Sequence, residues 1–167
     1  MDPMENSAQP AASTKVRLRS FSSSLPMMLL RAREAVMRRF RASLRQHDLT
    51  EQQWRVLRAL SSVGEIDITQ LARATFLLQP SLSRILKDLE SRGLIARRLN
   101  GDDRRIGLIA IGPAGAALIE AISPESEAIY AEITGLFGHQ KLADLQSLLI
   151  ELERRLVDDE GASSGDA

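Results

Sequence analysis

The chain has 167 residues, no cysteine and a formal net charge of zero. This length suits one domain of ordinary size, and 44% hydrophobic residues can form a sizeable core. The absence of cysteine excludes disulfides and cysteine-based peroxide sensing, and it fits a reducing cytoplasm. No apolar run approaches the roughly 20 residues that span a bilayer. We therefore expect a cytoplasmic protein that has no membrane partner.

Both ends of the chain have the composition of disordered tails. The first fourteen residues are rich in Ala, Ser, Pro and Gln and lack the apolar segment of a secretory signal. The last ten residues are acidic or small. We expect disorder over residues 1–20 and 158–167.

The zero net charge hides two oppositely charged halves. Residues 15–45 contain nine Lys and Arg against one acidic residue, a balance of +8. From residue 120 onward, eleven acidic residues oppose three basic ones, a balance of −8. Residues 79–105 carry seven basic and four acidic residues. A neutral total is therefore no argument against a nucleic-acid partner.

Two helices are predicted before residue 64. Residues 25–46 show apolar side chains at repeated spacings of three and four, which indicates a long amphipathic helix. A short hinge follows, in which Thr50 and Gln53 form the pattern of a capping box. Leu49 is placed to pack against the start of the helix that this box begins.

The next two predicted helices form a helix-turn-helix. Asp67 or Thr69 can cap the first, and Pro80 suits the first turn of the second. Gly93 stands where a left-handed helix end is favoured. The second helix has an inward face and an opposite polar face. The inward residues are Leu82, Ile85, Leu86 and Leu89, and the polar ones are Ser81, Arg84, Lys87 and Ser91.

A β-hairpin is predicted after this pair of helices. Residues 94–98 and 106–111 have strand-like patterns, and Asn100–Gly101 is a strong turn dipeptide. Residues 48–112 therefore predict a winged helix-turn-helix domain. The alternative is a charged surface hairpin in which Arg104 and Arg105 are merely solvated.

Nine side chains are candidates for contact with double-stranded DNA. Arg on the second helix can bridge guanine acceptors in the major groove, while Ser and backbone N–H groups hold phosphates. An Arg at the hairpin tip can enter the minor groove when a nearby carboxylate orients it. The candidates are Gln79, Ser81, Ser83, Arg84, Lys87, Arg98, Asp103, Arg104 and Arg105.

The C-terminal third predicts two more helices. One runs from residue 113 to about 137, interrupted or kinked at Ser123–Pro124, and the other covers residues 142–157 with a stripe of leucines. A small winged domain cannot cover these apolar stripes alone. We therefore expect residues 21–47 and 113–157 to form the dimerisation region of a homodimer that binds a palindromic operator. The alternative is an unpaired bundle packed on the winged domain. The expected fold class is mainly α (α+β).

Three motifs resemble the multiple antibiotic resistance regulator (MarR) family. They are Leu-Glu-Ser-Arg-Gly-Leu-Ile-Ala-Arg at 89–97, Asp-Asp-Arg-Arg at 102–105, and Gly115. The resemblance covers roughly residues 25–157. One departure is Ile-Gly-Pro-Ala-Gly at 111–115, where the family usually has Leu-Thr-Glu-Lys-Gly. It removes the hydroxyl cap before the helix, although Pro113 still suits a first turn.

Within this family, residues 25–60 are similar to regulators of homoprotocatechuate degradation. This resemblance implies an effector site for a small aromatic carboxylate, located where the dimer helices meet the DNA-binding lobe. Such a ligand needs an apolar wall, a cation and donors, for which Trp54, Arg31, His47 and Gln53 are the candidates. The alternatives are core packing for Trp54, a helix cap for His47, and solvent or DNA phosphate for Arg31.

No motif for catalysis is present in the sequence. It contains no Gly-rich phosphate loop, no Gly-x-Ser-x-Gly and no His-Glu-x-x-His, and its two histidines, His47 and His139, are far apart. We expect no enzyme, no metal and no cofactor. The prediction is a ligand-responsive transcriptional regulator, a repressor of a catabolic operon released by a small aromatic acid. The alternatives are a constitutive architectural DNA-binding protein without an effector, or a protein-interaction module.

Overall fold

The computed structural model describes residues 20–99 and 107–163. Residues 1–19 of the tail expected at 1–20 lie outside these residues, as do residues 164–167 of the tail expected at 158–167. The predicted hairpin tip at 100–106 also lies outside them. Internal contacts divide the chain into two units, residues 1–34 and 35–167, and each is described by itself.

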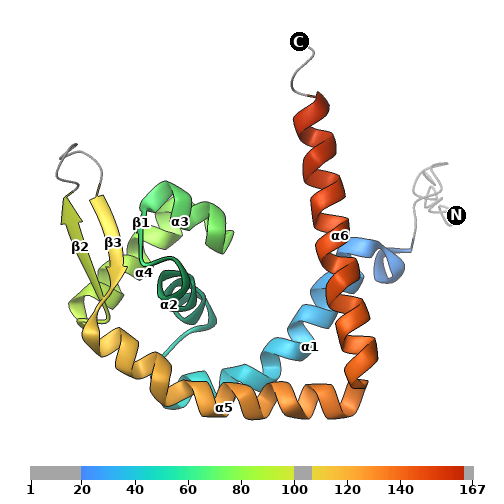
Figure 1. Ribbon diagram of the computed structural model, residues 1–167, viewed down its shortest axis with the longest axis horizontal. Helices are drawn as coiled ribbons and strands as arrows, with labels where there is room; N and C mark the ends of the chain where they lie inside the picture. The colour runs from blue at the N-terminus through green and yellow to red at the C-terminus, as the bar shows by residue number, and fades with distance from the viewer. Residues whose placement is uncertain (1–19, 100–106, 164–167) are drawn as a thin grey trace, which may run out of the picture. The chain divides into compact units, whose positions relative to one another are not determined.

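The described elements are mostly helical (Figure 1). In chain order they are the 3-10 turn η1 (Phe21–Ser23), α1 (Leu25–Gln46), α2 (Glu51–Val63), β1 (Glu65–Asp67), α3 (Ile68–Thr75), α4 (Gln79–Ser91), β2 (Ile95–Leu99), β3 (Gly107–Ile111), α5 (Pro113–Phe137) and α6 (His139–Ser163). This order confirms the predicted mainly α fold with a winged helix-turn-helix. None of the described helices has the length and apolar character needed to cross a membrane.

The sheet has three antiparallel strands in the order β1-β3-β2. Ile66 of β1 pairs with Ile109 of β3, and Ala96 of β2 pairs with Ala110 of β3. The hairpin β2–β3 was predicted, whereas β1 was not. A strand of three residues is too short to show an alternating pattern, and its partner lies far along the chain.

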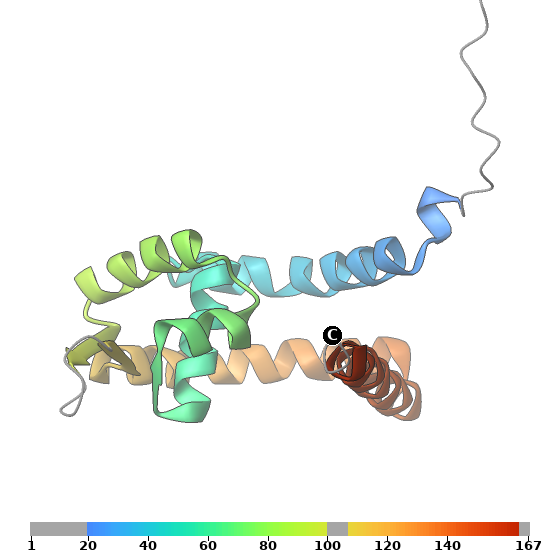
Figure 2. The ribbon, with the colours of Figure 1, turned by 90° about the horizontal axis from the view of Figure 1, so that it is seen from above.

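The core of the DNA-binding lobe lies between α2, α3, α4 and the sheet. Its fully buried side chains include Val56, Leu57, Leu60, Leu71, Leu82, Leu86 and Leu89. The predicted inward face of α4 is thereby confirmed, with Ile85 partly buried against the same core. The side chain of Thr75 is also buried, and its hydroxyl donates to the carbonyl of Leu71 at 2.6 Å. Figure 2 shows α2, α3 and α4 gathered next to the strands.

The predicted helix ends are confirmed by their hydrogen bonds. The Gln53 N–H donates to Thr50 Oγ1 at 3.2 Å, and the Thr50 N–H donates to Gln53 Oε1 at 2.7 Å, so the capping box is complete. Asp67 Oδ1 accepts from two backbone N–H groups at the start of α3. Gly93 has φ +69°, and the N–H of the following Leu94 donates back to Leu89. This is the left-handed helix end that glycine favours.

One expectation about the C-terminal helices was wrong, and another was wrong only in part. α5 continues through Pro124, which excludes an interruption at Ser123–Pro124, whereas the alternative of a kink there stays a prediction. Ile119 and Ile122 before the proline are buried in the core, and Ile129 and Ile133 after it are partly buried against the same core, so packing holds the helix on both sides of the missing N–H. α6 continues to Ser163, so residues 158–163 are helical rather than a disordered tail. A long helix propagates more easily than it nucleates, and composition alone does not show this.

The start of α5 packs closely on the hairpin. A Cβ added to Gly115 would lie 2.1 Å from the carbonyl oxygen of Leu94. Only glycine permits this approach, which sets where α5 leaves the winged domain. The cap before α5 is Gly112 without a side-chain hydrogen bond, and Pro113 occupies the first turn, as the sequence departure indicated.

Candidate DNA-binding and effector sites

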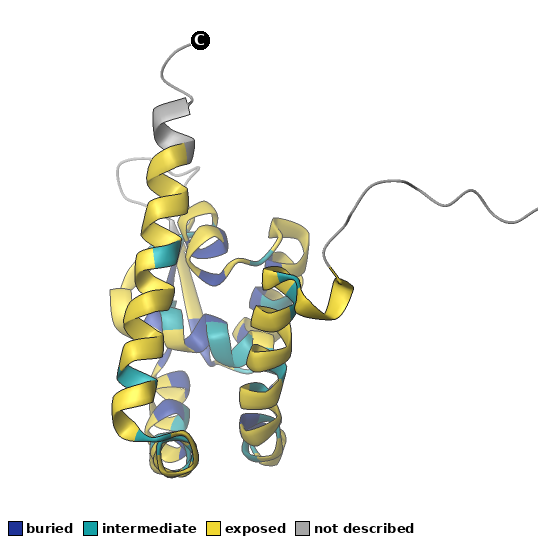
Figure 3. Ribbon diagram, turned by 90° about the vertical axis from the view of Figure 1, so that its right-hand side faces the viewer, coloured by how far each residue is buried: buried dark blue, intermediate teal, exposed yellow. Residues whose placement is uncertain are grey.

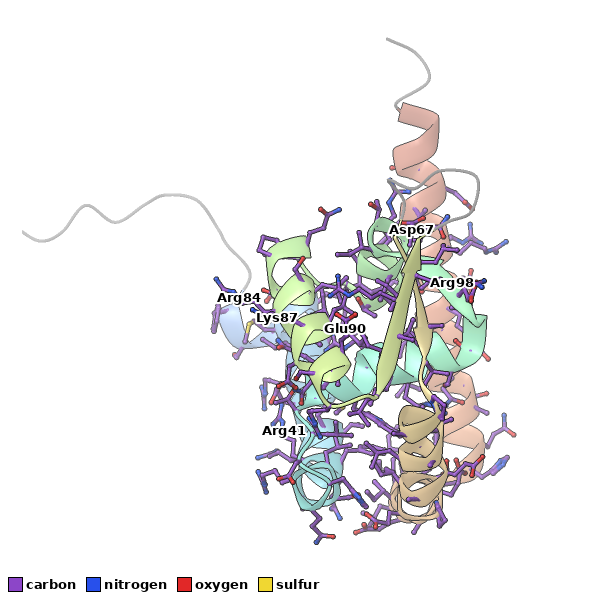
Figure 4. All side chains as sticks on the ribbon, turned by 90° about the vertical axis from the view of Figure 1, so that its left-hand side faces the viewer. Arg41, Asp67, Arg84, Lys87, Glu90 and Arg98 are labelled. Carbon is purple, nitrogen blue, oxygen red and sulfur yellow. The ribbon has the colours of Figure 1, made fainter. Side chains whose placement is uncertain are left out.

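The exposed face of α4 is the candidate recognition surface. Arg84 and Lys87 are exposed, and neither forms a hydrogen bond or ion pair with another described residue. Figure 4 shows both side chains on the side of α4 that faces away from the strands. Burial of Leu82, Leu86 and Leu89 on the opposite face fixes this orientation. The two cations are therefore free to meet an anionic partner.

The N-terminal end of α4 is open. Gln79, Ser81 and Ser83 are exposed in its first turns, and no side chain caps the helix. The first N–H groups of a helix have no partner within the helix, and they attract phosphate oxygens. Ser81 is exposed on α4 together with Arg84 and Lys87, as the predicted polar face requires, and a role of these residues in DNA binding stays a prediction.

The C-terminal half of α4 is anchored to the hinge between α1 and α2. Gln53 Nε2 donates to Asp88 Oδ2 at 2.7 Å, and Arg92 donates both to Asp88 at 3.5 Å and to the carbonyl of Asp48 at 3.0 Å. Asp48 itself has a positive φ of 53°. We call this set, Gln53, Asp88, Arg92 and the Asp48 carbonyl, the α4 anchor. It fixes the recognition helix against the segment that leads to the long helices.

A second network holds α2 and α3 together. Glu51 accepts hydrogen bonds from Arg41 of α1 and from Arg55, each at 3.0 Å. Arg55 also donates to the carbonyl of Thr75 at the end of α3, at 3.0 Å. The Glu51 side chain is only 16% exposed, so these bonds are partly shielded from water. They fix the frame on which the turn before α4 is built.

Two arginines of strand β2, Arg97 and Arg98, form ion pairs within the protein. Arg98 on β2 forms an ion pair with Glu65 on β1, and Arg97 pairs with Glu90 of α4 at 3.0 Å. Arg98, a DNA candidate, is thus already partnered, although its side chain is 66% exposed. The remaining wing candidates, Asp103, Arg104 and Arg105, lie outside the described residues.

Trp54 has a neighbour that sequence reasoning missed. The Trp54 ring is partly buried and packs against the core, and the guanidinium of Arg58 lies 5.9 Å from its centroid. The guanidinium lies over the ring, in the arrangement of a cation–π pair. The spacing of four residues on α2 was the available signal, because residues four apart share a helix face.

The other effector candidates are placed differently from one another. Both ends of the Gln53 amide are engaged, in the capping box and in the α4 anchor. Arg31 is exposed and belongs to the unit 1–34. No hydrogen bond or ion pair within the described ranges joins His47 to Trp54.

His47 belongs to a cluster with Ser43 and Glu125. Its Nε2 lies 3.2 Å from Glu125 Oε1, and the Ser43 hydroxyl donates to the other carboxylate oxygen. These bonds, first from Ser43 and then from His47, lower the pKa of Glu125 from its usual 4.5. The cluster joins the end of α1 to α5. On the same two helices, the rings of Phe40 and Tyr130 pack edge to face with their centroids 5.1 Å apart.

A shallow, open pocket of about 700 Å³ lies where α5 turns into α6. Its lining is Glu127, Tyr130, Ala131, Thr134, Gly135, Gly138 and His139. None of the predicted effector residues lines it. Because the pocket is open in one copy of the chain, it does not by itself provide the enclosed site that a small aromatic acid needs.

A helix-turn-helix with an exposed cationic second helix, followed by a β-hairpin, defines the winged helix-turn-helix class of DNA-binding proteins. Residues 47–106 match the MarR family. The chain is 37% identical over 132 residues to the HTH-type transcriptional regulator FarR of Neisseria gonorrhoeae, covering 79% of this chain and 90% of that protein. It belongs to the MarR family of transcriptional regulators.

Other similar proteins are also transcriptional regulators. The homoprotocatechuate degradative operon repressor of Escherichia coli is 38% identical over 128 residues, 77% of this chain and 86% of that protein. The crystal structure of the transcriptional regulator PA4135 has a TM-score of 0.77 and 42% identity, covering 78% of this chain and 96% of that one. The resemblance inferred from the sequence motifs is confirmed, and the family consists of regulators rather than enzymes.

Two further similar structures concern ligands. NadR in complex with 4-hydroxyphenylacetate has a TM-score of 0.74 and 36% identity, covering 82% of this chain and 98% of that one. The second is the structure of Bordetella bronchiseptica BpsR, described as showing regulation of DNA binding by 6-hydroxynicotinic acid. It has a TM-score of 0.72 and 26% identity, covering 81% of this chain and 97% of that one.

Proposed function

We propose that this protein is a homodimeric repressor of a catabolic operon that binds a palindromic operator and is released by a small aromatic carboxylic acid. One observation carries the DNA-binding half of this proposal. Arg84 and Lys87 project from a helix whose other face is buried, and no described residue neutralises them. Such a helix fits the major groove, where Arg bridges guanine and Lys meets phosphate.

The dimer is supported by the exposed apolar surface of α6. Figure 3 shows this helix exposed along most of its length. On one stripe of this helix, Leu148 is 63% exposed, Leu149 40% and Leu156 58%. Surfaces of this kind on a soluble chain mark contact with a partner. A second copy is the partner that turns one recognition helix into two, and so reads a palindrome.

The effector is supported by the chemistry around Trp54. The Arg58 guanidinium, which lies over the Trp54 ring, is the cation for a carboxylate, and the ring supplies the flat wall once the guanidinium swings off it to meet the ligand. Arg31 stays a second candidate cation on the unit 1–34. The two ligands named in the relatives' structures, 4-hydroxyphenylacetate and 6-hydroxynicotinic acid, are both small hydroxylated aromatic acids.

Gln53 links the proposed ligand site at Trp54 to the recognition helix. Its amide links the start of α2 to Asp88 on the recognition helix at 2.7 Å. A ligand on Trp54 that recruits this amide withdraws it from Asp88 and releases one contact of the α4 anchor. His47 is the second donor, held now by Glu125. The ligand shifts DNA affinity only by as much as it prefers one state over the other.

The wing completes the proposed interface. Asp103, Arg104 and Arg105 match the family's wing motif, and we assign Arg105 to the minor groove with Asp103 orienting it. Arg98, paired with Glu65, contributes to DNA affinity only if that ion pair opens.

The test starts from a duplex selected out of a random library by the full-length chain. A palindromic consensus is expected, and failure to enrich any sequence would favour the protein-interaction module. Benzoates, phenylacetates and nicotinates that carry hydroxyl groups are then titrated. We expect quenching of Trp54, the only tryptophan, and release of the duplex. Ligand at 100 times its Kd should stabilise the fold by about 2.7 kcal/mol.

Two variants assign the cation. Arg58→Ala should abolish the ligand's effect while the free protein still binds the duplex, whereas Arg31→Ala should leave the effect intact. If Arg31→Ala abolishes the ligand's effect and Arg58→Ala does not, Arg31 is the cation that binds the carboxylate. If no acid in the panel quenches Trp54 or releases the duplex, the protein is a constitutive DNA-binding protein instead.

A further inference from the structure

The turn between α3 and α4 exposes two large apolar side chains. Phe76 is 83% exposed and Leu78 is 78% exposed, the two highest values among the large hydrophobic side chains of the described residues. Leu77 between them is partly buried and packs against the core. With Leu77 turned inward, its two neighbours are directed into solvent.

Phe76 occupies a backbone position that favours glycine. It ends α3 with φ 52° and ψ 38°, in the left-handed region. The N–H of Phe76 donates to Arg73 at 3.3 Å, and the N–H of Leu77 donates to Ala72 at 3.2 Å. This is the helix ending in which glycine, or sometimes asparagine, usually stands because a Cβ is strained there. An aromatic side chain here lowers local stability without any core contact in return.

Leu78 breaks a second local rule. It is the N-cap of α4, with φ −65° and ψ 137° and no side-chain hydrogen bond to the helix. Ser, Thr, Asp or Asn at this position would cap a free N–H, and leucine cannot. Natural chains depart from such rules mainly at functional sites. Two departures, two residues apart and both at largely exposed side chains, indicate that this turn serves recognition rather than folding.

The position of the turn identifies the partner. Leu78 directly precedes Gln79, the first residue of the recognition helix, and residues at this end of such a helix contact base edges. Arg73 precedes Phe76 by three residues on α3, and Arg84 and Lys87 follow Leu78 by six and nine residues on α4; all three side chains are exposed and have no described partner. An apolar protein surface would leave these cations uncompensated, whereas DNA phosphates neutralise them.

We infer that Phe76 and Leu78 read the 5-methyl groups of thymines in the major groove, and so select the operator. The apolar group on a base edge there is the thymine methyl, and apolar side chains are its partners. This inference rests on the proposed DNA-binding function and adds a specificity element to it. The cations supply affinity, and the two apolar side chains discriminate thymine from other bases.

The test replaces each thymine of the selected duplex with deoxyuridine, which removes the methyl and leaves the hydrogen-bonding edge unchanged. The wild-type chain should bind the thymine duplex roughly fourfold more tightly for each contacted methyl, the factor expected for burying one such group. Single replacements should locate two sensitive positions in each half-site, one assigned to Phe76 and one to Leu78.

Two variants test the residues without weakening the fold. Leu78→Ser restores a helix cap, and Phe76→Gly relieves the left-handed strain, so both should keep or raise the melting temperature. Each should lose the thymine preference at its own position. Val63→Ala, a control at an exposed apolar residue at the end of α2, should keep the preference at both.

The outcomes separate the two claims. Failure of the wild-type chain to bind any selected duplex overturns the proposed function. Tight binding with no difference between thymine and deoxyuridine duplexes overturns the methyl contacts and leaves the DNA-binding function in place. If both variants keep the thymine preference, Phe76 and Leu78 do not contact the thymine methyl groups.

Discussion

Arg84 and Lys87 lie on the same exposed face of α4, yet the geometry of their donors differs. A guanidinium can donate two parallel hydrogen bonds to guanine, whereas an ammonium acts as a point charge towards phosphate. Arg84→Ala should therefore cost about 1–3 kcal/mol on the operator and relax the preference at one base pair. Equal losses on operator and random DNA would contradict this role.

Lys87→Ala should instead weaken binding to all sequences to a similar extent. It removes one phosphate contact, so the slope of log K against log salt should fall by roughly one. Titrations at several salt concentrations, with operator and random duplexes, measure both variants side by side. A base preference changed by Lys87→Ala would show that it reads sequence instead.

Glu125 makes stability depend on acid pH. Hydrogen bonds from Ser43 and His47 lower its pKa below the usual 4.5. A carboxyl with a lowered folded pKa stabilises the protein above its unfolded pKa, and this contribution is lost as pH falls through the folded pKa. The stability difference between wild type and Glu125→Gln should thus shrink below about pH 4.5. Urea unfolding at several pH values measures it.

Glu127→Gln is the matched control for that experiment. Glu127 lies on the same helix but has no hydrogen bond or ion pair with the described residues. Its stability difference from wild type should not change over the same pH range. Parallel behaviour of the two variants would remove the Ser43–His47–Glu125 cluster as the cause.

At the scale of elements, the position of α4 depends on one carboxylate. Asp88 accepts from Gln53 in the first turn of α2 and from Arg92, and so ties α4 to the start of α2. Asp88→Ala should loosen this orientation and lower operator affinity. The same change removes a negative charge near the DNA and should raise affinity for random duplexes. The ratio of the two affinities should therefore fall by about tenfold, the equivalent of roughly 1.4 kcal/mol.

Asp88→Asn separates orientation from charge. It keeps an acceptor oxygen for the Gln53 amide and removes the charge, so it should retain most of the operator preference while random binding rises. Fluorescence anisotropy with both duplexes measures the ratio. If Asp88→Ala leaves the ratio at the wild-type value, the α4 anchor does not orient the recognition helix for DNA.

At the scale of the whole molecule, α6 exposes an apolar surface that a monomer leaves in water. A charge placed there should prevent the second copy from packing, since burying an unpaired carboxylate is strongly unfavourable. Leu148→Glu should therefore yield a folded monomer with much weaker operator binding. Sedimentation gives the mass and circular dichroism the helix content. Gln146→Glu, a polar exposed site on the same helix, is the control and should remain dimeric.

Local signals in the sequence were sufficient for α1, for α4 and for the start of α2. Apolar residues at helical spacing predicted α1 and α4, the Thr50–Gln53 box began α2, and Gly93 ended α4 where a positive φ is needed. Each signal acts within a few residues, so it can be read without knowing the fold. The polar face of α4 followed from the same periodicity.

Only the tertiary structure decided which side chains meet across the chain. It paired Gln53 with Asp88, Arg98 with Glu65 and His47 with Glu125, although two of these residues had been assigned to an effector and one to DNA. It also added β1, three residues whose partner strand lies far along the chain. Contacts between distant residues depend on how the elements pack, and no local periodicity encodes that packing.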